Sequence, residues 1–266
     1  MDYHVIDVFT DKLFGGSPAG VCMLQSWPPG GIMQYIAAEN NLPGTAFLVK
    51  QEDGYYGLRW FTPTLELDLC GHATMASAFV LFESSEQNAQ ELRFKTWSGV
   101  LSVVRKGDML QMSLPSLSAK ESNAYPIIEK AFGVKPISCL ESIDILVLLE
   151  SEDAVLNVSP DFDMIRRLKT DGGLGHDRFG VIVTAEGKDS DYVYRYFAPN
   201  IGVDEDPATG RANCTLTPFW SQRLGKKAMT VKQLSARGGA FLCEDNGEYV
   251  SISGKSVRYL RGYIHL

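Results

Sequence analysis

One short pattern occurs twice in this chain, and it constrains the fold more than any other feature of the sequence. Residues 59–63 read Arg-Trp-Phe-Thr-Pro, and residues 195–199 read Arg-Tyr-Phe-Ala-Pro. In each copy an acidic loop follows and leads to Gly-X-Ala, at residues 71–73 and again at residues 210–212. Two copies of one pattern predict two structurally similar halves.

The first copy changes from strand-forming to helix-forming residues. Arg59 to Phe61 predict a strand that ends at Pro63, and Ala73 to Glu83 predict a helix that is apolar on nearly every side. A helix of this kind is buried all round. Its first backbone N–H groups are unpaired and lie at the positive end of the helix dipole, so they offer a site for a carboxylate or another anion.

The second copy predicts another helix, residues 212–224, with the same kind of N-terminal end. Two facing helix ends would clamp one acidic small molecule between the two halves. The alternative is that both copies are packing motifs whose loops only cap the helices. The repetition of the pattern favours a site.

Composition limits the compartment and the classes of partner. The chain has 266 residues, 45% of them apolar, which supports extensive hydrophobic cores. Its net charge of -7, with no cluster of Lys and Arg, argues against nucleic acids and membrane surfaces as partners. Five cysteines without a C-x-x-C pair, and the lack of an apolar run long enough to span a bilayer, favour a cytoplasmic protein.

The histidines do not form a metal-binding pattern. His4 and His265 fall in predicted terminal strands, and His176 falls in a predicted loop. None has a second ligand at a spacing typical of metal sites, so we predict no metal.

Predicted strands greatly outnumber predicted helices. The strands cover residues 3–9, 21–24, 45–50, 59–61, 91–95, 99–105, 109–114, 143–150, 179–185, 192–197, 232–234, 240–244, 249–252, 256–259 and 263–266. Helices are predicted at residues 31–39, 73–83, 125–132, 161–169 and 212–224. The polar residues 116–123 mark a boundary between domains at 1–116 and 117–266, and the last strands can cross back to the first half.

The economical architecture for this pattern is an α+β protein. We expect two pseudo-symmetric domains, each a curled mixed β-sheet wrapped around a central apolar helix, with an active-site cleft between them.

A series of motifs, taken in order along the chain, resembles one known family. The motifs are D-V-F-T-D-x-x-F-G-G-x-P-A at residues 7–19, A-x-E-x-N-L at 37–42, R-W-F-T-P at 59–63, C-G-H-A-T at 70–74, R-Y-F-A-P at 195–199, E-D-P-A-T-G at 205–210 and L-S-x-R-G-G at 234–239. They resemble the phenazine-biosynthesis PhzF-like family, within the diaminopimelate-epimerase-like fold. The resemblance implies a cleft site, a homodimer, and isomerisation by proton transfer without a cofactor.

Three motif positions depart from the family pattern. The family's N-L-S-E-T carries a glutamate that resembles a general acid/base, but this chain has Gly44 at that place. Glu39 cannot simply replace it, since five residues upstream on the same helix it would face nearly the opposite direction. The family's G-N-P has become a Gly-Ser-Pro with Ser17, and the family's D-P-x-T-G-S-A-H has Arg211 and Asn213 in place of Ser and His.

Three candidates for proton transfer are left. His72 and Asp206 match positions that the family uses in its cleft, and both side chains can be tuned to titrate near neutrality. Cys70 lies in a Cys-Gly loop that resembles the base loop of the related epimerases, and the neighbouring helix N-terminus would favour a thiolate. Cys70 could instead be a buried packing residue, and its counterpart Thr209 is too weak a base to complete a two-cysteine racemase.

The remaining candidate residues would bind the substrate. They are Ser17, Gly71, Ala73, Thr209, Gly210 and Arg211. Arg211 occupies the repeat position equivalent to His72, and its guanidinium suits a second carboxylate or a phosphate. Alternatively, Arg211 pairs with Asp204, Glu205 or Asp206.

The sequence thus supports two hypotheses about function. The first is an isomerase or epimerase that transfers a proton on a small anionic, carboxylate-bearing metabolite with a changed catalytic set. The second is a catalytically impaired member, without the glutamate at position 44, that binds a small acid or a protein partner.

Overall fold

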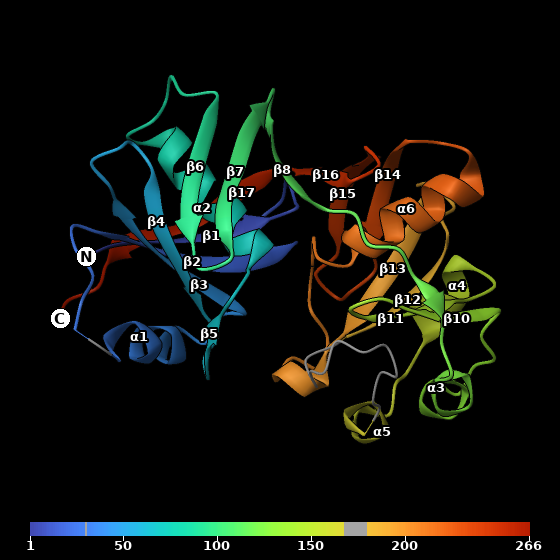
Figure 1. Cartoon of the computed structure of the whole chain (residues 1–266). Coiled ribbons are helices and arrows are strands. Elements are labelled where there is room, and N and C mark those ends of the chain that lie inside the picture. Colours follow the sequence, from blue (N-terminus) through green and yellow to red (C-terminus); the bar gives the residue numbers. More distant parts are fainter. Residues whose placement is uncertain (30, 168–179) are drawn as a thin grey trace. The chain divides into compact units, whose positions relative to one another are not determined.

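The computed structural model describes residues 1–29, 31–167 and 180–266. These residues form two compact units (Figure 1): the first unit comprises Met1–Ser113 and Ser253–Leu266, and the second comprises Leu114–Ile252. The sequence places the boundary after residue 116; in the structure the chain divides after Ser113, and Ser253–Leu266 return to the first unit. His176 and the predicted loop around it lie outside the described residues.

The first unit is built on a mixed sheet with two helices. In order across the sheet the strands are β17 (Ser256–Tyr263), β1 (Asp2–Val8), β2 (Ser17–Leu24), β3 (Gly44–Lys50), β4 (Tyr56–Phe61), β6 (Glu91–Thr96), β7 (Gly99–Lys106) and β8 (Met109–Pro115). The short β5 (Glu66–Leu67) pairs with the end of β4. The helices are α1 (Ile32–Asn40) and α2 (Gly71–Glu83).

Helix α2 lies at the centre of the first unit, as predicted. It packs against β1, β2, β3, β7 and β17, and ten of its side chains are buried. Its buried hydroxyls bond within the helix: Thr74 Oγ1 donates to the Cys70 carbonyl at 2.8 Å, and Ser77 Oγ donates to the Ala73 carbonyl at 2.7 Å. No outside partner is needed for these groups, so an almost wholly apolar environment can surround the helix.

The second unit has its own mixed sheet with helices. The strands are β9 (Lys120–Glu121), β10 (Ser138–Glu141), β11 (Ile145–Leu148), β12 (Val181–Glu186), β13 (Tyr192–Phe197), β14 (Ala228–Gln233), β15 (Gly239–Asp245) and β16 (Tyr249–Gly254). The helices are α3 (Tyr125–Phe132), α4 (Glu152–Asn157), α5 (Phe162–Arg166), the 3-10 turn η1 (Pro199–Ile201) and α6 (Asn213–Leu224). One apolar core joins α3, α4 and α5 to the sheet and includes Phe132, Ile165 and Phe197.

The two sheets repeat the same sequence of pairings. In the first unit β2 and β3 are parallel, β3 and β4 antiparallel, β4 and β6 parallel, and β6 and β7 antiparallel. In the second unit β11, β12, β13, β14 and β15 pair in the same alternation. Helices α2 and α6 occupy equivalent places, before β6 and before β14. The predicted α+β fold with two similar halves is therefore confirmed.

One prediction about the second half is wrong: its central helix is not fully apolar. Helix α6 begins at Asn213 and buries Asn213, Thr215 and Thr217. The Tyr192 hydroxyl donates to Asn213 Oδ1 at 3.0 Å and lies 3.0 Å from Thr217 Oγ1. Asn213 Nδ2 in turn donates to the Tyr194 hydroxyl at 3.2 Å. These hydrogen bonds offset the cost of burying the polar side chains.

Several element boundaries also differ from the prediction. Strand β17 is continuous from Ser256 to Tyr263, where the sequence predicts two short strands, because pairing with β1 carries it through Gly262. The sequence does not predict strands β5, β9 and β10. Helix α5 ends at Arg166, short of the predicted end at residue 169. No helix among the described residues is long and apolar enough to cross a membrane.

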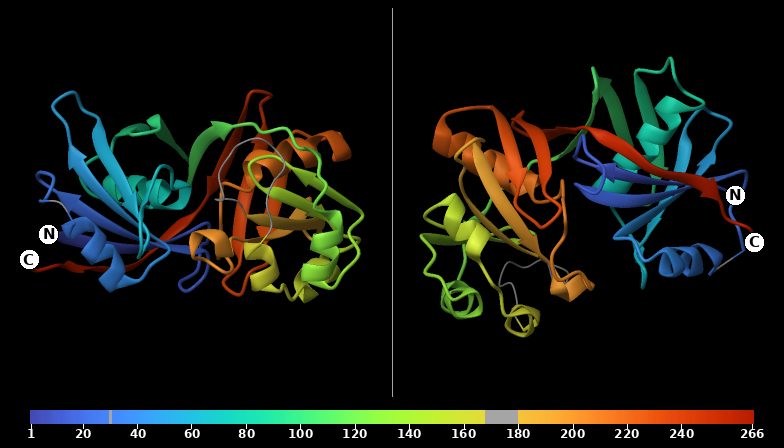
Figure 2. Two further views of the ribbon diagram at one scale, coloured as in Figure 1. Left: turned by 60° about the horizontal axis from the view of Figure 1, so that its bottom comes forward. Right: turned by 180° about the vertical axis from the view of Figure 1, so that it is seen from behind.

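The two ends of the chain lie side by side in the first unit (Figure 2). The amino group of Met1 donates to the Ile264 carbonyl at 3.0 Å, and the Ile264 amide donates to the Met1 carbonyl at 3.0 Å. Strand β17 thereby covers the outer edge of β1 and leaves that edge of β1 fully paired.

Candidate functional site

The arginine that opens each copy of the repeated pattern has a structural role. Arg59 on β4 forms a bidentate pair with Glu66, from Nε to Oε1 at 2.6 Å and from Nη2 to Oε2 at 2.7 Å. Its guanidinium also lies 5.4 Å from the centre of the Phe61 ring. The pair ties the acidic loop to the strand that precedes α2, and so fixes where that helix begins.

The second copy uses the same device. Arg195 on β13 donates to Glu205, from Nε at 2.7 Å and from Nη2 at 3.0 Å, and lies 4.9 Å from the centre of the Phe197 ring. We call these two arginine–glutamate pairs the Arg59 clamp and the Arg195 clamp. They position the loops that carry the candidate site residues. Sequence reasoning identified the repeated arginine but assigned it no partner.

In the first unit, Cys70 and His72 lie together at the N-terminal end of α2. The sulfur of Cys70 lies 3.6 Å from Nδ1 and 3.9 Å from Nε2 of His72, within hydrogen-bond reach for sulfur. Cys70 is 5% exposed and His72 is 8% exposed. Burial lowers the pKa of His72 to about 4, so its imidazole is neutral at physiological pH.

Gly44, the first residue of β3, lies directly against this pair. A Cβ atom at Gly44 would come within 2.9 Å of His72 Nε2 and 3.1 Å of Cys70 Sγ. The imidazole therefore occupies the space into which a side chain at position 44 would project. The structure thus brings together three of the predicted catalytic positions, and it gives the glycine a positive role: it makes room for the Cys70–His72 pair.

Ser17 lies on the same face of the first sheet. It is the first residue of β2, two residues before Ala19, and Ala19 is the register partner of Gly44. Its side chain is fully buried, and its Oγ has no hydrogen-bond partner among the described residues. Buried hydroxyls normally have a hydrogen-bond partner, so Ser17 stays a candidate site residue.

In the second unit, Arg211 is bound by a residue that the sequence did not suggest. Its Nε and Nη2 each lie 3.1 Å from the Asp144 carboxylate, which is 1% exposed. The same carboxylate accepts hydrogen bonds from the Tyr196 hydroxyl at 3.1 Å and from the Gly180 amide at 2.7 Å. The charges of Arg211 and Asp144 cancel, and each donor of this network has its acceptor on Asp144.

The predicted alternative partners of Arg211 are wrong. Asp204 pairs with Arg166 at 2.9 Å, and Glu205 belongs to the Arg195 clamp. Asp144 follows β10 and precedes β11, far from residue 211 in the sequence. The sequence did contain a signal for Asp144, because it is an acidic residue directly before an apolar strand. A carboxylate is buried at such a position only if it is paired.

Asp206 has no cationic partner among the described residues. Its Oδ1 accepts a hydrogen bond from the Ala208 amide at 3.1 Å. Burial by the surrounding protein, with a smaller effect from the nearby Glu205 charge, raises the pKa of Asp206 to about 6. A carboxyl group with this pKa exchanges protons readily near neutral pH.

The backbone at the two helix ends offers hydrogen-bond donors. Among the described residues, the amides of residues 71–73 and of residues 210–212 have no acceptor, so Gly71, Ala73 and Gly210 remain candidates for binding an anion. Thr209 differs, because its amide donates to Gln233 Oε1 at 2.7 Å and its carbonyl accepts from the Tyr194 hydroxyl at 2.7 Å. The backbone of Thr209 is therefore engaged within the protein.

The described residues contain no group of three or more His, Cys, Asp and Glu side chains placed to hold a metal ion.

Comparison with known proteins gives a consistent result. The family model described as phenazine biosynthesis-like protein matches residues 6–262. An uncharacterized isomerase of Pseudomonas aeruginosa is 44% identical over 100% of this chain and 99% of its own length. A second uncharacterized isomerase of that organism is 43% identical over 98% of this chain and 97% of its own length.

Solved structures agree with these relatives. The crystal structure of a phenazine biosynthesis protein of the PhzF family from Enterococcus faecalis superimposes with a TM-score of 0.94, at 38% identity, over 100% of this chain and 99% of that one. The crystal structure of a probable proline racemase from Agrobacterium radiobacter superimposes with a TM-score of 0.63 at 11% identity, over 100% of this chain and 93% of the racemase chain. This similarity shows the fold alone.

Proposed function

Because the chain belongs to the phenazine biosynthesis-like protein family, we propose that it is an isomerase or epimerase of the PhzF type that moves a proton on a small carboxylate-bearing metabolite without a cofactor. Relatives named as isomerases support the reaction class. The observation that carries the proposal is the Cys70–His72 pair, buried against Gly44 at the end of α2.

In this proposal Cys70 and His72 act as one proton-transfer pair. The low pKa of His72 disfavours a resting imidazolium, so the imidazole accepts the thiol proton only as the sulfur takes a proton from carbon, and the free amides of residues 71–73 stabilise the charge that develops on sulfur. The S–H group formed in this way can return its proton to carbon. The pair takes the place of the glutamate that Gly44 cannot supply.

Asp206 is the proposed second acid/base. With a pKa near 6 it is mostly ionised at pH 7 but is easily protonated, so it can accept or return the second proton of an isomerisation. We assign substrate binding to the free backbone amides at the two helix ends, to Ser17, and to Arg211. The Asp144 pair neutralises Arg211, so we expect its Nη1 to act as a hydrogen-bond donor rather than as an excess positive charge.

The test is solvent deuterium exchange. The protein is incubated in D2O with a panel of small mono- and dicarboxylates, and deuterium uptake at single carbons is followed by NMR. We expect uptake into one compound, and a loss of about 10²- to 10⁴-fold in the Cys70→Ser and His72→Asn variants. Cys139→Ser, at a similarly buried cysteine in the second unit, and His265→Asn should exchange at the wild-type rate.

The catalytically impaired binder is the second candidate, and the glycine at position 44 favours it. Tight binding of a carboxylate with no deuterium uptake, in wild type and variants alike, would establish it over the isomerase. Failure of every carboxylate to bind would point instead to a protein partner.

Two further expectations belong to this proposal. We propose that the protein forms a homodimer, which light scattering after gel filtration would measure directly. We also propose that it works in the cytoplasm, where buried cysteines remain reduced.

A further inference from the structure

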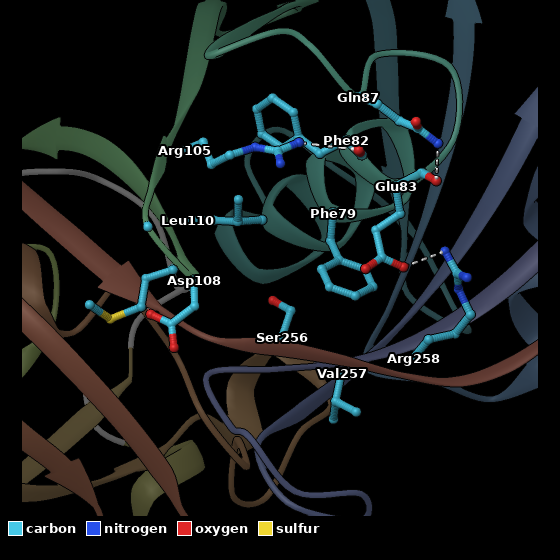
Figure 3. A pocket seen from close by; sticks show the side chains of 12 residues that line it. Phe79, Phe82, Glu83, Gln87, Arg105, Asp108, Leu110, Ser256, Val257 and Arg258 are labelled. Atoms are coloured by element: carbon cyan, nitrogen blue, oxygen red, sulfur yellow. Dashed lines mark hydrogen bonds and ion pairs between the residues drawn. The ribbon is translucent and has the colours of Figure 1, made fainter.

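A cavity lies in the first unit, and neither Cys70 nor His72 is among its lining residues. Its volume is about 980 Å³, and the C-terminal part of α2, β7, β8 and β17 contribute its walls. Phe79 and Phe82 of α2 and Leu110 of β8 form apolar wall, and Arg105, Ser256 and Arg258 are among the polar residues (Figure 3). Phe82 is ten residues from His72, or roughly 15 Å along the helix.

Arg105 is a cation without a counter-ion. It is only partly exposed and forms no ion pair among the described residues. Its Nη2 donates to the Phe82 carbonyl at 3.1 Å, its guanidinium lies 4.6 Å from the centre of the Phe82 ring, and its Nε has no acceptor. Charged groups that are removed from water are normally paired with an opposite charge. The surroundings of Arg105 therefore favour binding of an anion.

The opposite side of the cavity is already neutral. Arg258 pairs with Glu83 at 3.2 Å and lies 5.8 Å from the Phe79 ring centre, and Asp108 pairs with Lys255 at 2.7 Å. In Figure 3, Arg105 and Arg258 lie on opposite sides, with Phe79 and Ser256 between them. The hydroxyl of Ser256 and the Nε of Arg258 have no partner among the described residues. One uncompensated positive charge and unused donors thus border an apolar wall.

We propose that this cavity binds a small organic anion with a single carboxylate and an apolar body. The carboxylate would pair with Arg105, and the apolar body would lie along Phe79 and Leu110. A single negative charge fits better than a phosphate dianion, because Arg105 is the unpaired cation of the lining and Arg258 already pairs with Glu83. Both rings hold their arginines in place before the ligand arrives, which lowers the entropy cost of binding.

Two methionine methyl groups can report the two sites separately. Met109 lines the cavity, whereas the Met112 methyl lies 3.2 Å from where a Cβ of Gly71 would be, at the other end of α2. Protein labelled with ¹³C-methyl methionine is titrated with hexanoate and followed by NMR. The Met109 signal, assigned from Met109→Leu, should shift to saturation. Hexanol, hexylamine and acetate, which lack the charge, carry the wrong charge or lack the apolar body, should bind at least tenfold more weakly.

Variants decide whether Arg105 holds the carboxylate. Arg105→Gln should weaken the hexanoate-induced shift of Met109 about tenfold or more, whereas Arg105→Lys, which keeps the charge, should retain most of the affinity. Arg93→Gln, at an exposed arginine paired with Glu91 in the same unit, is the matched control and should bind like wild type. His72→Asn should also leave the Met109 titration unchanged.

Three results would overturn the proposal. They are an unmoved Met109 signal at tens of millimolar hexanoate, an equal shift with hexanol and hexylamine, and undiminished binding by an Arg105→Gln protein whose spectrum shows that it is folded. A shift of Met112 without Met109 would place the anion at the end of α2 and would equally reject the cavity.

Discussion

The N-terminal ends of α2 and α6 occupy equivalent places in the two units, yet they carry different kinds of side chains. At α2 the side chains are the Cys70 thiol group and the neutral imidazole of His72, which contact each other. At α6 the equivalent of His72 is Arg211, which is charged and bound by the buried carboxylate of Asp144. The same backbone pattern therefore positions a cysteine–histidine pair in one half and an ion pair in the other.

A pair of glycines makes the comparison sharper. Thr45 of β3 pairs with Phe61, and Val181 of β12 pairs with Phe197, so the preceding glycines, Gly44 and Gly180, are equivalent. Gly44 makes room for His72 and Cys70.

Gly180 serves a different neighbour. It lies against the Tyr196 ring and donates its amide to Asp144. Each glycine thus allows a close approach, Gly44 to the Cys70–His72 pair and Gly180 to the network around Asp144. An internal repeat can keep its backbone geometry while the chemistry of its two copies diverges.

The largest expected effect comes from breaking the ion pair of the second unit. Asp144→Asn leaves the Arg211 cation without its charge partner and replaces the oxygen that accepts from Arg211 Nε by an NH2 group, whereas the other oxygen remains for the Tyr196 hydroxyl and the Gly180 amide. We expect a loss of about 3 kcal/mol in the free energy of unfolding, measured by urea denaturation, at the low end for a buried pair because the Arg211 side chain is 40% exposed. The matched control, Asp163→Asn, affects a carboxylate that is 80% exposed and should change stability by less than about 0.5 kcal/mol. An Asp144→Asn protein as stable as the control would show that the network contributes little.

Acidification should affect the two halves with opposite sign. His72 has a pKa of about 4 in the folded protein, against an ordinary value of 6.5, so the unfolded chain gains its proton first. The stability from this group is complete above pH 6.5 and is lost as the pH falls towards 4. Asp206 has a pKa of about 6 against an ordinary value of 3.8, so its ionised form destabilises the folded state above pH 6 and the penalty disappears as the pH falls towards 3.8.

Single variants separate these contributions. In urea unfolding at pH 7 and pH 5, His72→Asn should remove the loss of stability on acidification, whereas Asp206→Asn should make that loss steeper. Each effect is on the order of 1–3 kcal/mol over the full range, because one pKa unit corresponds to about 1.4 kcal/mol. Parallel pH profiles for wild type and both variants would contradict both assignments.

Adding one methyl group to each equivalent glycine should give a smaller difference. A Cβ at Gly180 would overlap the Tyr196 ring, which is fully enclosed, whereas a Cβ at Gly44 would meet the edge of His72. We expect Gly180→Ala to cost about 2–3 kcal/mol and Gly44→Ala about 1 kcal/mol, measured as free energies of unfolding. Gly44→Ala should still slow deuterium exchange, because the methyl group displaces His72. Equal stabilities with normal exchange would show that neither glycine is required for close approach.

Sequence reasoning captured the features that depend on local pattern. The repeat predicted two similar sheets, and the apolar run after Gly71 predicted the buried helix α2. The pairing of Arg211 with Asp144 could not be predicted, because it joins a helix end to a loop that has no motif. The polar interior of α6 was missed for a related reason: Asn213 and Thr217 look unfavourable until the tyrosines of β13 are placed beside them.

The adjacency of Met1 and Ile264 sets an order for the assembly of this protein. Synthesis runs from the N-terminus, so residues 114–252 are complete as a continuous second unit before β17 exists. In the first unit, the outer edge of β1 stays unpaired until Ser256–Tyr263 have been synthesised. An open strand edge is a place where aggregation begins, and pairing between distant segments is slow. A circular permutant that links Leu266 to Met1 and opens the chain elsewhere would make β17 and β1 neighbours in sequence and shorten this vulnerable period.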